Sequence, residues 1–120
     1  MSVYRFHEAD LKPTFAHGGG APVRSARVLE RSQSTGCNFV DLVVVPPGAE
    51  IGVHAHGCDD EEIYVVIEGT GCMLLDGESL RVGPGDVLVN RPGGTHGLIN
   101  PSCLPLRLVV IDVRAGGSTL

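Results

Sequence analysis

The chain has 120 residues, enough for one domain with a single buried core and too few for two. Its 14 acidic residues outnumber its 9 basic ones, and the net charge of -5 comes without any Lys/Arg cluster, which argues against nucleic acid and anionic membranes as partners. No apolar run approaches the roughly 20 residues that span a bilayer, and the sequence predicts a cytoplasmic protein.

Residues 1–25 form an N-terminal arm ahead of the regular part of the chain. The stretch SVYRFHEADL at 2–11 is compatible with an edge strand or a short helical turn. The stretch AHGGGAPVRS at 16–25 predicts a flexible connection because its glycine triplet interrupts regular structure, and a strand could follow at 26–30.

Short runs rich in Val, Ile and Leu then follow one another, separated by turns rich in Gly and Pro. The expected strands are 38–45, 51–56, 62–68, 70–76, 79–82, 86–90, 96–100 and 106–113. The Asp76-Gly77 pair is typical of a two-residue hairpin turn. Strands of this length and spacing predict one all-β domain over residues 1–120, an antiparallel sandwich or barrel with its core at about 36–113.

The four cysteines are widely spaced and form no C-x-x-C pair. This arrangement predicts reduced thiols, packed mostly as small apolar side chains. Cys58 differs because it lies within the stretch HAHGCDDEEIY at 54–64, where a soft ligand could matter.

Two histidines in that stretch are expected on one face of a strand. Side chains of a strand alternate between its faces, so His54 and His56 point to the same side and can reach one cation. In the next strand the same alternation puts Glu62, Tyr64 and Val66 on one face and Glu61 on the other, so only one glutamate faces inward. Asp59 and Asp60 are expected in the turn. The bland alternative is an exposed His-x-His pair beside a solvated acidic loop.

Two longer patterns resemble the motifs of the cupin superfamily. The first is Gly48, five residues, His54-x-His56, a gap, Glu62, six residues and Gly69. The second is Gly85, five residues, Arg91, one residue, Gly93, two residues, His96, three residues and Asn100. The sequence departs from the family in two places: the gap before Glu62 is about one residue longer than usual, and Arg91 stands where proline is usual, with Pro92 next to it.

The resemblance implies a small antiparallel double-sheet jelly-roll barrel that holds one divalent transition metal per chain. Carried over position by position, the metal ligands are His54, His56, Glu62 and His96, and the Glu-x6-Gly spacing to Gly69 selects Glu62. Three imidazoles and one carboxylate suit Fe, Mn, Ni, Co, Cu or Zn, and disfavour Ca and Mg, which prefer oxygen. The motif glycines are expected in turns, and Asn100 as a hydrogen-bonding residue at a strand end.

Three other residues have a functional and a structural interpretation. Tyr64 shares the inward face with Glu62 and either donates a proton or orients substrate, or is an ordinary core tyrosine. Arg91 either binds a substrate carboxylate or phosphate or faces solvent. His17, beside the Gly18–Gly20 triplet, belongs either to a flap over the barrel mouth or to a disordered linker. Arg27 and Met73 receive no assignment.

Two hypotheses about function follow from the metal site that the resemblance implies. The first is a metal-dependent enzyme acting on a small, polar, oxygenated substrate through open metal positions; isomerase or epimerase, dioxygenase, lyase and cyclase remain open. The second is a non-catalytic module that binds a metal and a small molecule. Because the runs at 38–45 and 106–113 are apolar on both faces, we also expect a homodimer formed through a sheet face or an exchanged edge strand.

Overall fold

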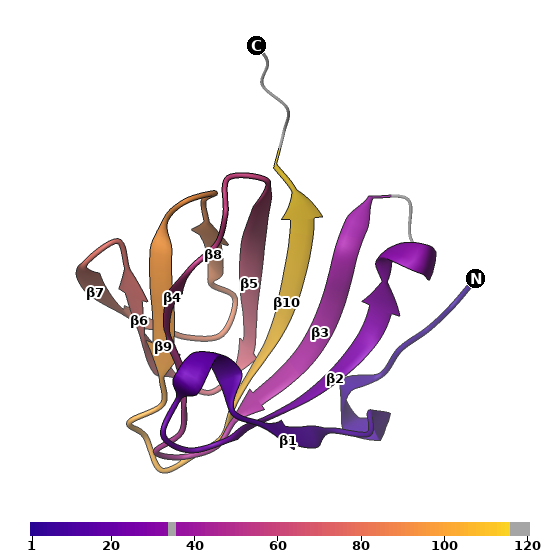
Figure 1. Cartoon of the computed structure of the whole chain (residues 1–120). Coiled ribbons are helices and arrows are strands. Elements are labelled where there is room, and N and C mark those ends of the chain that lie inside the picture. Colours follow the sequence, from indigo (N-terminus) through magenta and orange to yellow (C-terminus); the bar gives the residue numbers. More distant parts are fainter. Residues whose placement is uncertain (34–35, 116–120) are drawn as a thin grey trace.

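The computed structural model describes residues 1–33 and 36–115, and it is built almost entirely from strands (Figure 1). The ten strands in these residues are β1 (Lys12–Thr14), β2 (Val23–Glu30), β3 (Cys37–Val45), β4 (Glu50–Ala55), β5 (Asp60–Glu68), β6 (Gly71–Leu75), β7 (Glu78–Val82), β8 (Val87–Asn90), β9 (Thr95–Ile99) and β10 (Leu106–Arg114). The same described ranges also contain three single 3-10 turns: η1 (Phe6–Glu8), η2 (Ala16–Gly18) and η3 (Arg31–Gln33). The predicted all-β class is confirmed.

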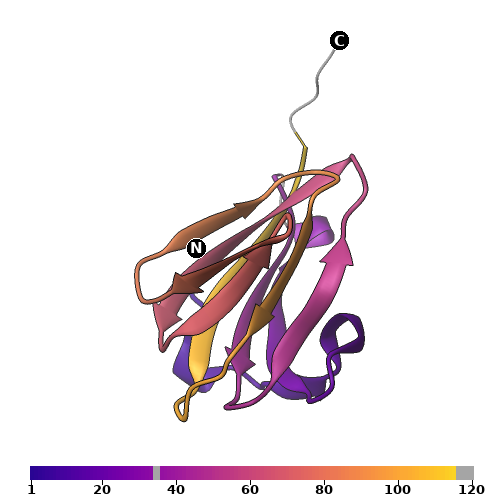
Figure 2. The same cartoon turned by 90° about the vertical axis from the view of Figure 1, so that its left-hand side faces the viewer.

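The strands form two antiparallel sheets. A six-stranded sheet has the order β1-β2-β3-β10-β5-β8, and a four-stranded sheet has the order β4-β9-β6-β7. The larger sheet curves toward the smaller one, and the two lie face to face (Figures 1 and 2). Over the described ranges no strand pairing joins them, so the jelly roll is a double-sheet barrel whose two layers remain separate ladders.

The core lies between the two sheets because the strands alternate. In β10, Leu106, Leu108 and Val110 are buried while the residues between them are partly exposed. Met73 and Leu98, both fully buried, come from the smaller sheet. Each buried side chain of this size stabilises the fold by about 1.5–3 kcal/mol relative to an exposed one, and together they fix which face of each strand looks inward.

Tight turns keep the ligand strands in place. Asp76 and Gly77 join β6 to β7 with φ of 49° and 82°, the left-handed pair that a type I′ hairpin requires. All four motif glycines also have positive φ, which a side chain would strain: Gly48, Gly69, Gly85 and Gly93. Asn100 donates to the carbonyl oxygens of Val45 and Leu104, both at 2.8 Å, as expected for a structural residue.

The N-terminal arm is more ordered than the sequence indicates. It supplies β1 and the first residues of β2, which therefore begins before the predicted strand at 26–30. The Phe6 ring lies 5.7 Å from the Arg107 guanidinium, so the arm also reaches the outer face of β10. Within the described part of the chain, no helix has the length and hydropathy needed to cross a membrane.

Candidate metal centre

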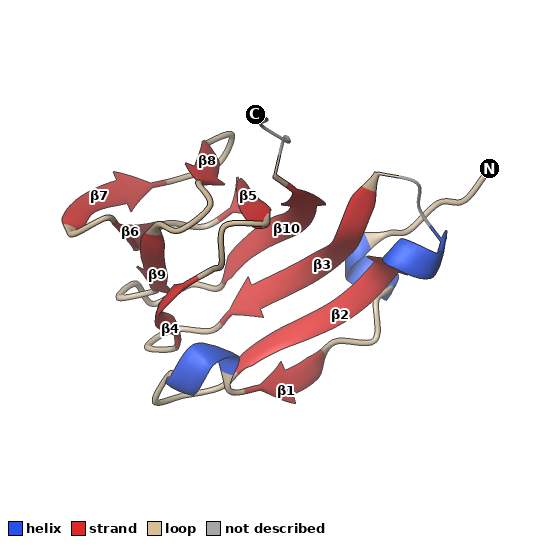
Figure 3. Cartoon of the chain, turned by 45° about the horizontal axis from the view of Figure 1, so that its top comes forward, coloured by secondary structure: helices blue, strands red, loops and turns tan. Residues whose placement is uncertain are grey.

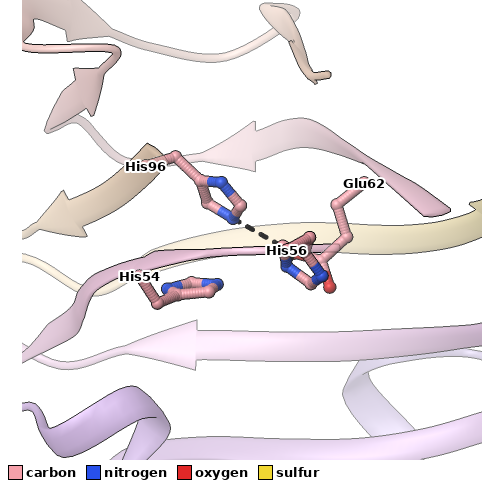
Figure 4. A group of neighbouring side chains, drawn as sticks. All are labelled: His54, His56, Glu62 and His96. Atoms are coloured by element: carbon pink, nitrogen blue, oxygen red, sulfur yellow. Dashed lines mark hydrogen bonds and ion pairs between the residues drawn. The ribbon is translucent and has the colours of Figure 1, made fainter. Parts of the chain in front are cut away.

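Four side chains converge inside the barrel: one each from β4, β5 and β9, and one from the residue just after β4 (Figure 4). His54 and His96 are directly paired across β4 and β9, and the pairing is irregular between Ile51 and His54. Glu62 and His96 are 5% and 1% exposed. The ligand atoms of His54, His56, Glu62 and His96 all lie within 4.8 Å of one another, so the structure brings together the four residues that the resemblance selected.

These separations fit a single ion. Two ligand atoms that each bind one ion at about 2.1 Å cannot lie more than about 4.2 Å apart. The Glu62 Oε1 atom lies 3.3 Å from His56 Nε2 and 3.4 Å from His96 Nε2, already inside that limit. Side-chain shifts of well under 1 Å would bring the remaining pairs within it, and the donor set suits a borderline divalent metal.

Two of the histidines are held in the tautomer that a metal needs. The Nδ1 of His54 donates to the Gly52 carbonyl oxygen at 2.7 Å, and the Nδ1 of His56 donates to Asp60 Oδ2 at 2.9 Å. Because a carbonyl oxygen only accepts, the proton of neutral His54 lies on Nδ1 and the Nε2 lone pair is free. Both Nε2 atoms are buried and make no hydrogen bond with the described residues, which is the arrangement expected of metal ligands.

The protonation states agree with this role. Burial lowers the pKa of His54 to about 4, with His96, His17 and His56 adding to the shift. Burial alone would raise the pKa of Glu62, but the hydrogen bond to His96 and the neighbouring imidazoles lower it below its ordinary value. At neutral pH the site therefore presents a neutral imidazole and an ionised carboxylate, the forms that bind metal.

Asp60 was predicted in the turn, and that prediction is wrong. It begins β5, shares the inward face with Glu62, and accepts the hydrogen bond of His56. Its carboxyl group also interacts with that of Asp112, whose Oδ1 accepts a hydrogen bond from Asn38 Nδ2 at 2.8 Å. Burial and the neighbouring Asp60 raise the pKa of Asp112 to about 7. The alternation that places Glu62 on the inward face also places Asp60 there, because β5 begins at Asp60, two residues before the predicted start of the strand at residue 62.

Two more polar side chains border Glu62. Tyr64 is buried, with its ring edge-on to His96 at 5.7 Å, and burial together with the Glu62 carboxylate raises its pKa well above the usual value. Asn90 lies opposite Glu62 in the β5–β8 pairing, so both side chains occupy the same face. It is 2% exposed, and neither its nitrogen nor its oxygen has a hydrogen-bond partner among the described residues.

The arm of His17 lies over the site, so the disordered-linker interpretation is wrong. The His17 ring stacks on His54 with centroids 3.4 Å apart and planes 7° apart, and η2 lies beside β4 (Figure 3). A Cβ at Gly52 would overlap the His17 carbonyl oxygen, and one at Gly19 would crowd the Glu50 carbonyl oxygen. The close approach therefore requires glycine at both contact points. Gly19 belongs to the HGGG stretch, whereas Gly52 lies outside it, in β4.

Two residues flagged from the sequence lie outside this cluster. The Arg91 side chain is 75% exposed, so it faces solvent. Its Nη1 lies 3.9 Å from Glu61 Oε2, and this contact at the surface shows that Glu61 points outward. Cys58 is an exposed free thiol in the turn between β4 and β5, and it is not among the clustered ligands of the described residues.

Sequence relatives share this part of the chain. An uncharacterized protein of Methanocaldococcus jannaschii is 36% identical over 66 residues, 55% of this chain and 52% of that protein. An oxalate-binding protein of Thermotoga maritima is 25% identical over 97 residues, 80% of this chain and 79% of that protein. The chain spans about half the length of the first relative.

Solved structures share the fold. A predicted oxalate decarboxylase from T. maritima superimposes with a TM-score of 0.88 at 23% identity, covering 95% of this chain and 100% of that one. The polyketide cyclase RemF of Streptomyces resistomycificus gives 0.79 at 18% identity, with 97% and 82% covered. The model of the Cupin domain family matches residues 41–112, which include all four clustered ligands. With both motifs, the double-sheet fold and this match over more than half of its length, the chain belongs to the cupin family.

Proposed function

We propose that this chain is a metal-dependent enzyme that acts on a small oxygenated substrate at one divalent transition metal. The observation that carries the proposal is the convergence of four ligand atoms within 4.8 Å, two of them buried Nε2 atoms without a hydrogen-bond partner. His54, His56, Glu62 and His96 would hold the metal. A metal of five or six coordination would keep one or two positions free, which distinguishes a catalytic site from a closed structural one.

The surrounding residues suit catalysis. When bound, such a metal would act as a Lewis acid toward a substrate oxygen. Asp60 and the Gly52 carbonyl hold two ligand imidazoles in one tautomer, and the raised pKa of Tyr64 keeps its hydroxyl protonated, so that it can donate a hydrogen bond to a neighbouring oxygen. The His17 ring restricts access to His54. The reaction class remains open because one fold hosts several chemistries.

The second candidate is a non-catalytic module that binds a metal and a small ligand. It is favoured by the name of one relative, the oxalate-binding protein of T. maritima. Oxalate presents two oxygens that could occupy two free metal positions, so this candidate uses the same site. The two candidates differ only in whether the bound molecule is changed.

The metal ligands are tested by metal analysis of protein prepared without an affinity tag. We expect about one transition metal per chain, and loss of it in Glu62→Ala and His96→Ala. Glu61→Ala is the matched control, because Glu61 is adjacent in sequence but faces Arg91 at the surface. Full metal content in Glu62→Ala would contradict the ligand set.

Turnover then separates the two candidates. Metal-loaded protein would be screened for O2 uptake and for conversion of oxalate, phosphosugars, uronates and diketones. An enzyme should convert one of these classes, with activity lost in His96→Ala. Tight reversible binding of a compound, with the compound recovered unchanged, would favour the binding module.

We also propose that the protein is a cytoplasmic homodimer. Cys58, Cys72 and Cys103 form no disulfide, which supports a reducing compartment. Exposed apolar side chains on the outer face of the six-stranded sheet, including Ile67 in β5 and Val87 in β8, support association through a sheet face.

A further inference from the structure

A cavity of about 330 Å³ opens beside the candidate metal ligand Glu62. Its volume is at the lower end of the range for small-molecule pockets. The N-terminal arm and the inner face of the six-stranded sheet line it, and its polar and aromatic side chains include His17, Arg27, Phe39, Asp41, Glu62 and Tyr64. The metal site is therefore connected to a pocket that part of the arm encloses.

The strand register shows how this pocket is laid out. Tyr64 pairs with Val110, Val110 with Asp41, and Asp41 with Arg27, so these four residues form one row across β5, β10, β3 and β2. All four line the cavity. Three strand spacings correspond to roughly 14 Å between the ends of the row, and the curvature of the sheet and the length of the arginine shorten the gap between functional groups. Arg27 thus lies at the far end of the pocket from the metal site.

Asp41 and Phe39 hold the Arg27 guanidinium in place, but they leave some of its N–H groups without an acceptor among the described residues. Its Nε donates to Asp41 Oδ1 at 2.9 Å and its Nη2 to Asp41 Oδ2 at 3.1 Å, while its guanidinium lies 3.9 Å over the Phe39 ring. The register of β2 shifts just after Arg27, the kind of bulge that redirects a side chain. A guanidinium has five N–H groups, and the described residues bind only those on Nε and Nη2, so the Nη1 group remains available to an acceptor.

The chemistry of the guanidinium and the polarity of the wall indicate what that acceptor is. A guanidinium prefers carboxylates because charge-assisted hydrogen bonds are stronger than those to neutral acceptors, and Asp41 engages only the Nε and Nη2 groups of Arg27. The wall between the two ends is apolar, formed in part by the buried Val43 and Val110. A fitting ligand has oxygens at one end, a short apolar body and an anionic group at the other end.

We propose that Arg27 binds a terminal carboxylate of the substrate, so that the site selects small acids whose opposite end carries the oxygens bound at the metal. This inference rests on the proposed function, because the second end of the ligand is the metal position. Asp41 and Phe39 act as positioning residues that orient the guanidinium. The alternative is that Arg27 and Asp41 form only a cross-strand ion pair and bind no ligand. With 46% of the Arg27 side chain exposed, such a pair would contribute little to stability.

The test uses cobalt(II)-loaded protein and hydroxamates as metal-binding probes. Hydroxamates with two to four methylenes and a terminal carboxylate are compared with equally long hydroxamates that end in a methyl group. Affinity is read from the visible spectrum of the cobalt. For at least one length we expect the carboxylate to improve affinity about tenfold or more, the scale of a charge-assisted hydrogen bond. This advantage should fall to about twofold or less in Arg27→Gln and persist in Arg91→Gln, which removes the same charge from an exposed site.

The outcomes separate the two proposals. If no hydroxamate alters the cobalt spectrum, the open metal positions are absent and the proposed function fails together with this inference. If all hydroxamates bind but the carboxylate brings no advantage, or Arg27→Gln keeps the full advantage, this inference alone is overturned. Arg27→Lys guards against a folding defect, because it keeps a cation beside Asp41 but loses the planar fork, and a partial loss of the advantage is expected.

Discussion

Asp60 provides the sharpest test of how the centre is held together. Its carboxylate accepts the hydrogen bond of His56 Nδ1 at 2.9 Å, and both side chains are largely shielded, with 16% and 21% of their surface exposed for His56 and Asp60. Removing a group that orients a metal-binding histidine typically weakens metal affinity 10- to 100-fold, or about 1.4–2.7 kcal/mol. We therefore expect Asp60→Ala to bind zinc or cobalt weaker by that factor, and Asp60→Asn, which keeps an acceptor oxygen, to lie between it and the wild type.

The assay is a competition titration against a chelating indicator at pH 7, with circular dichroism to verify the fold. Asp59→Ala is the matched control, because it removes the same charge one residue away in the exposed turn. If Asp60→Ala and Asp59→Ala bind metal equally well, the hydrogen bond to His56 does not orient the ligand, and the interpretation of the tautomers is wrong.

Four further predictions concern the surroundings of the centre. Gly52→Ala should displace the His17 arm and cost about 1–3 kcal/mol in unfolding experiments, whereas Gly83→Ala, whose Cβ would meet only Thr70 Cγ2 at 3.9 Å, should stay within about 0.5 kcal/mol of the wild type. Asn90→Leu should change metal-free stability by less than about 1 kcal/mol, since its amide has no partner among the described residues; a loss above about 2 kcal/mol would reveal a hydrogen bond there. Because the pKa of His54 is lowered to about 4 in the folded chain, only the unfolded chain protonates this histidine between pH 6.5 and 4. The free energy of unfolding of the metal-free protein should therefore fall as the pH drops through this range. The fall should exceed that of His54→Gln by about 1–2 kcal/mol, after allowance for the partial exposure of the imidazole. Light scattering at micromolar concentration should give the mass of a dimer, and a monomer would remove the homodimer proposal.

Local patterns in the sequence predicted most of the scaffold. Period-2 alternation and Gly/Pro breaks located eight strands to within a residue or two, and the same alternation separated Glu62 from Glu61. These features depend on neighbours in the chain, which is why they could be derived without a structure. The identification of His96 as the fourth candidate ligand needed the resemblance, since 34 residues separate it from Glu62.

Features that depend on distant contacts could not be predicted. The row from Tyr64 to Arg27 exists because β10 lies between β5 and β3, an order that no local pattern shows. The position of His17 depends on a positive φ of 52° and on the missing side chain of Gly52 in another strand. The N-terminal arm therefore looked like a linker, although Phe6 and β1 bind it to the body of the protein.

The placement of the arm and β2 has a consequence for how proteins of this kind diverge. The residues that match the family, 41–112, contain all four residues of the candidate metal cluster, whereas His17, Arg27 and Phe39 precede them. Under the proposed roles, the residues that would bind the metal and the residue that would select the substrate therefore lie in different parts of the chain. A substitution before residue 41 would then alter which molecules are accepted without changing the metal ligands, so two proteins with identical ligands need not share a substrate. Assigning a role by inheritance from the matched region alone would miss that difference.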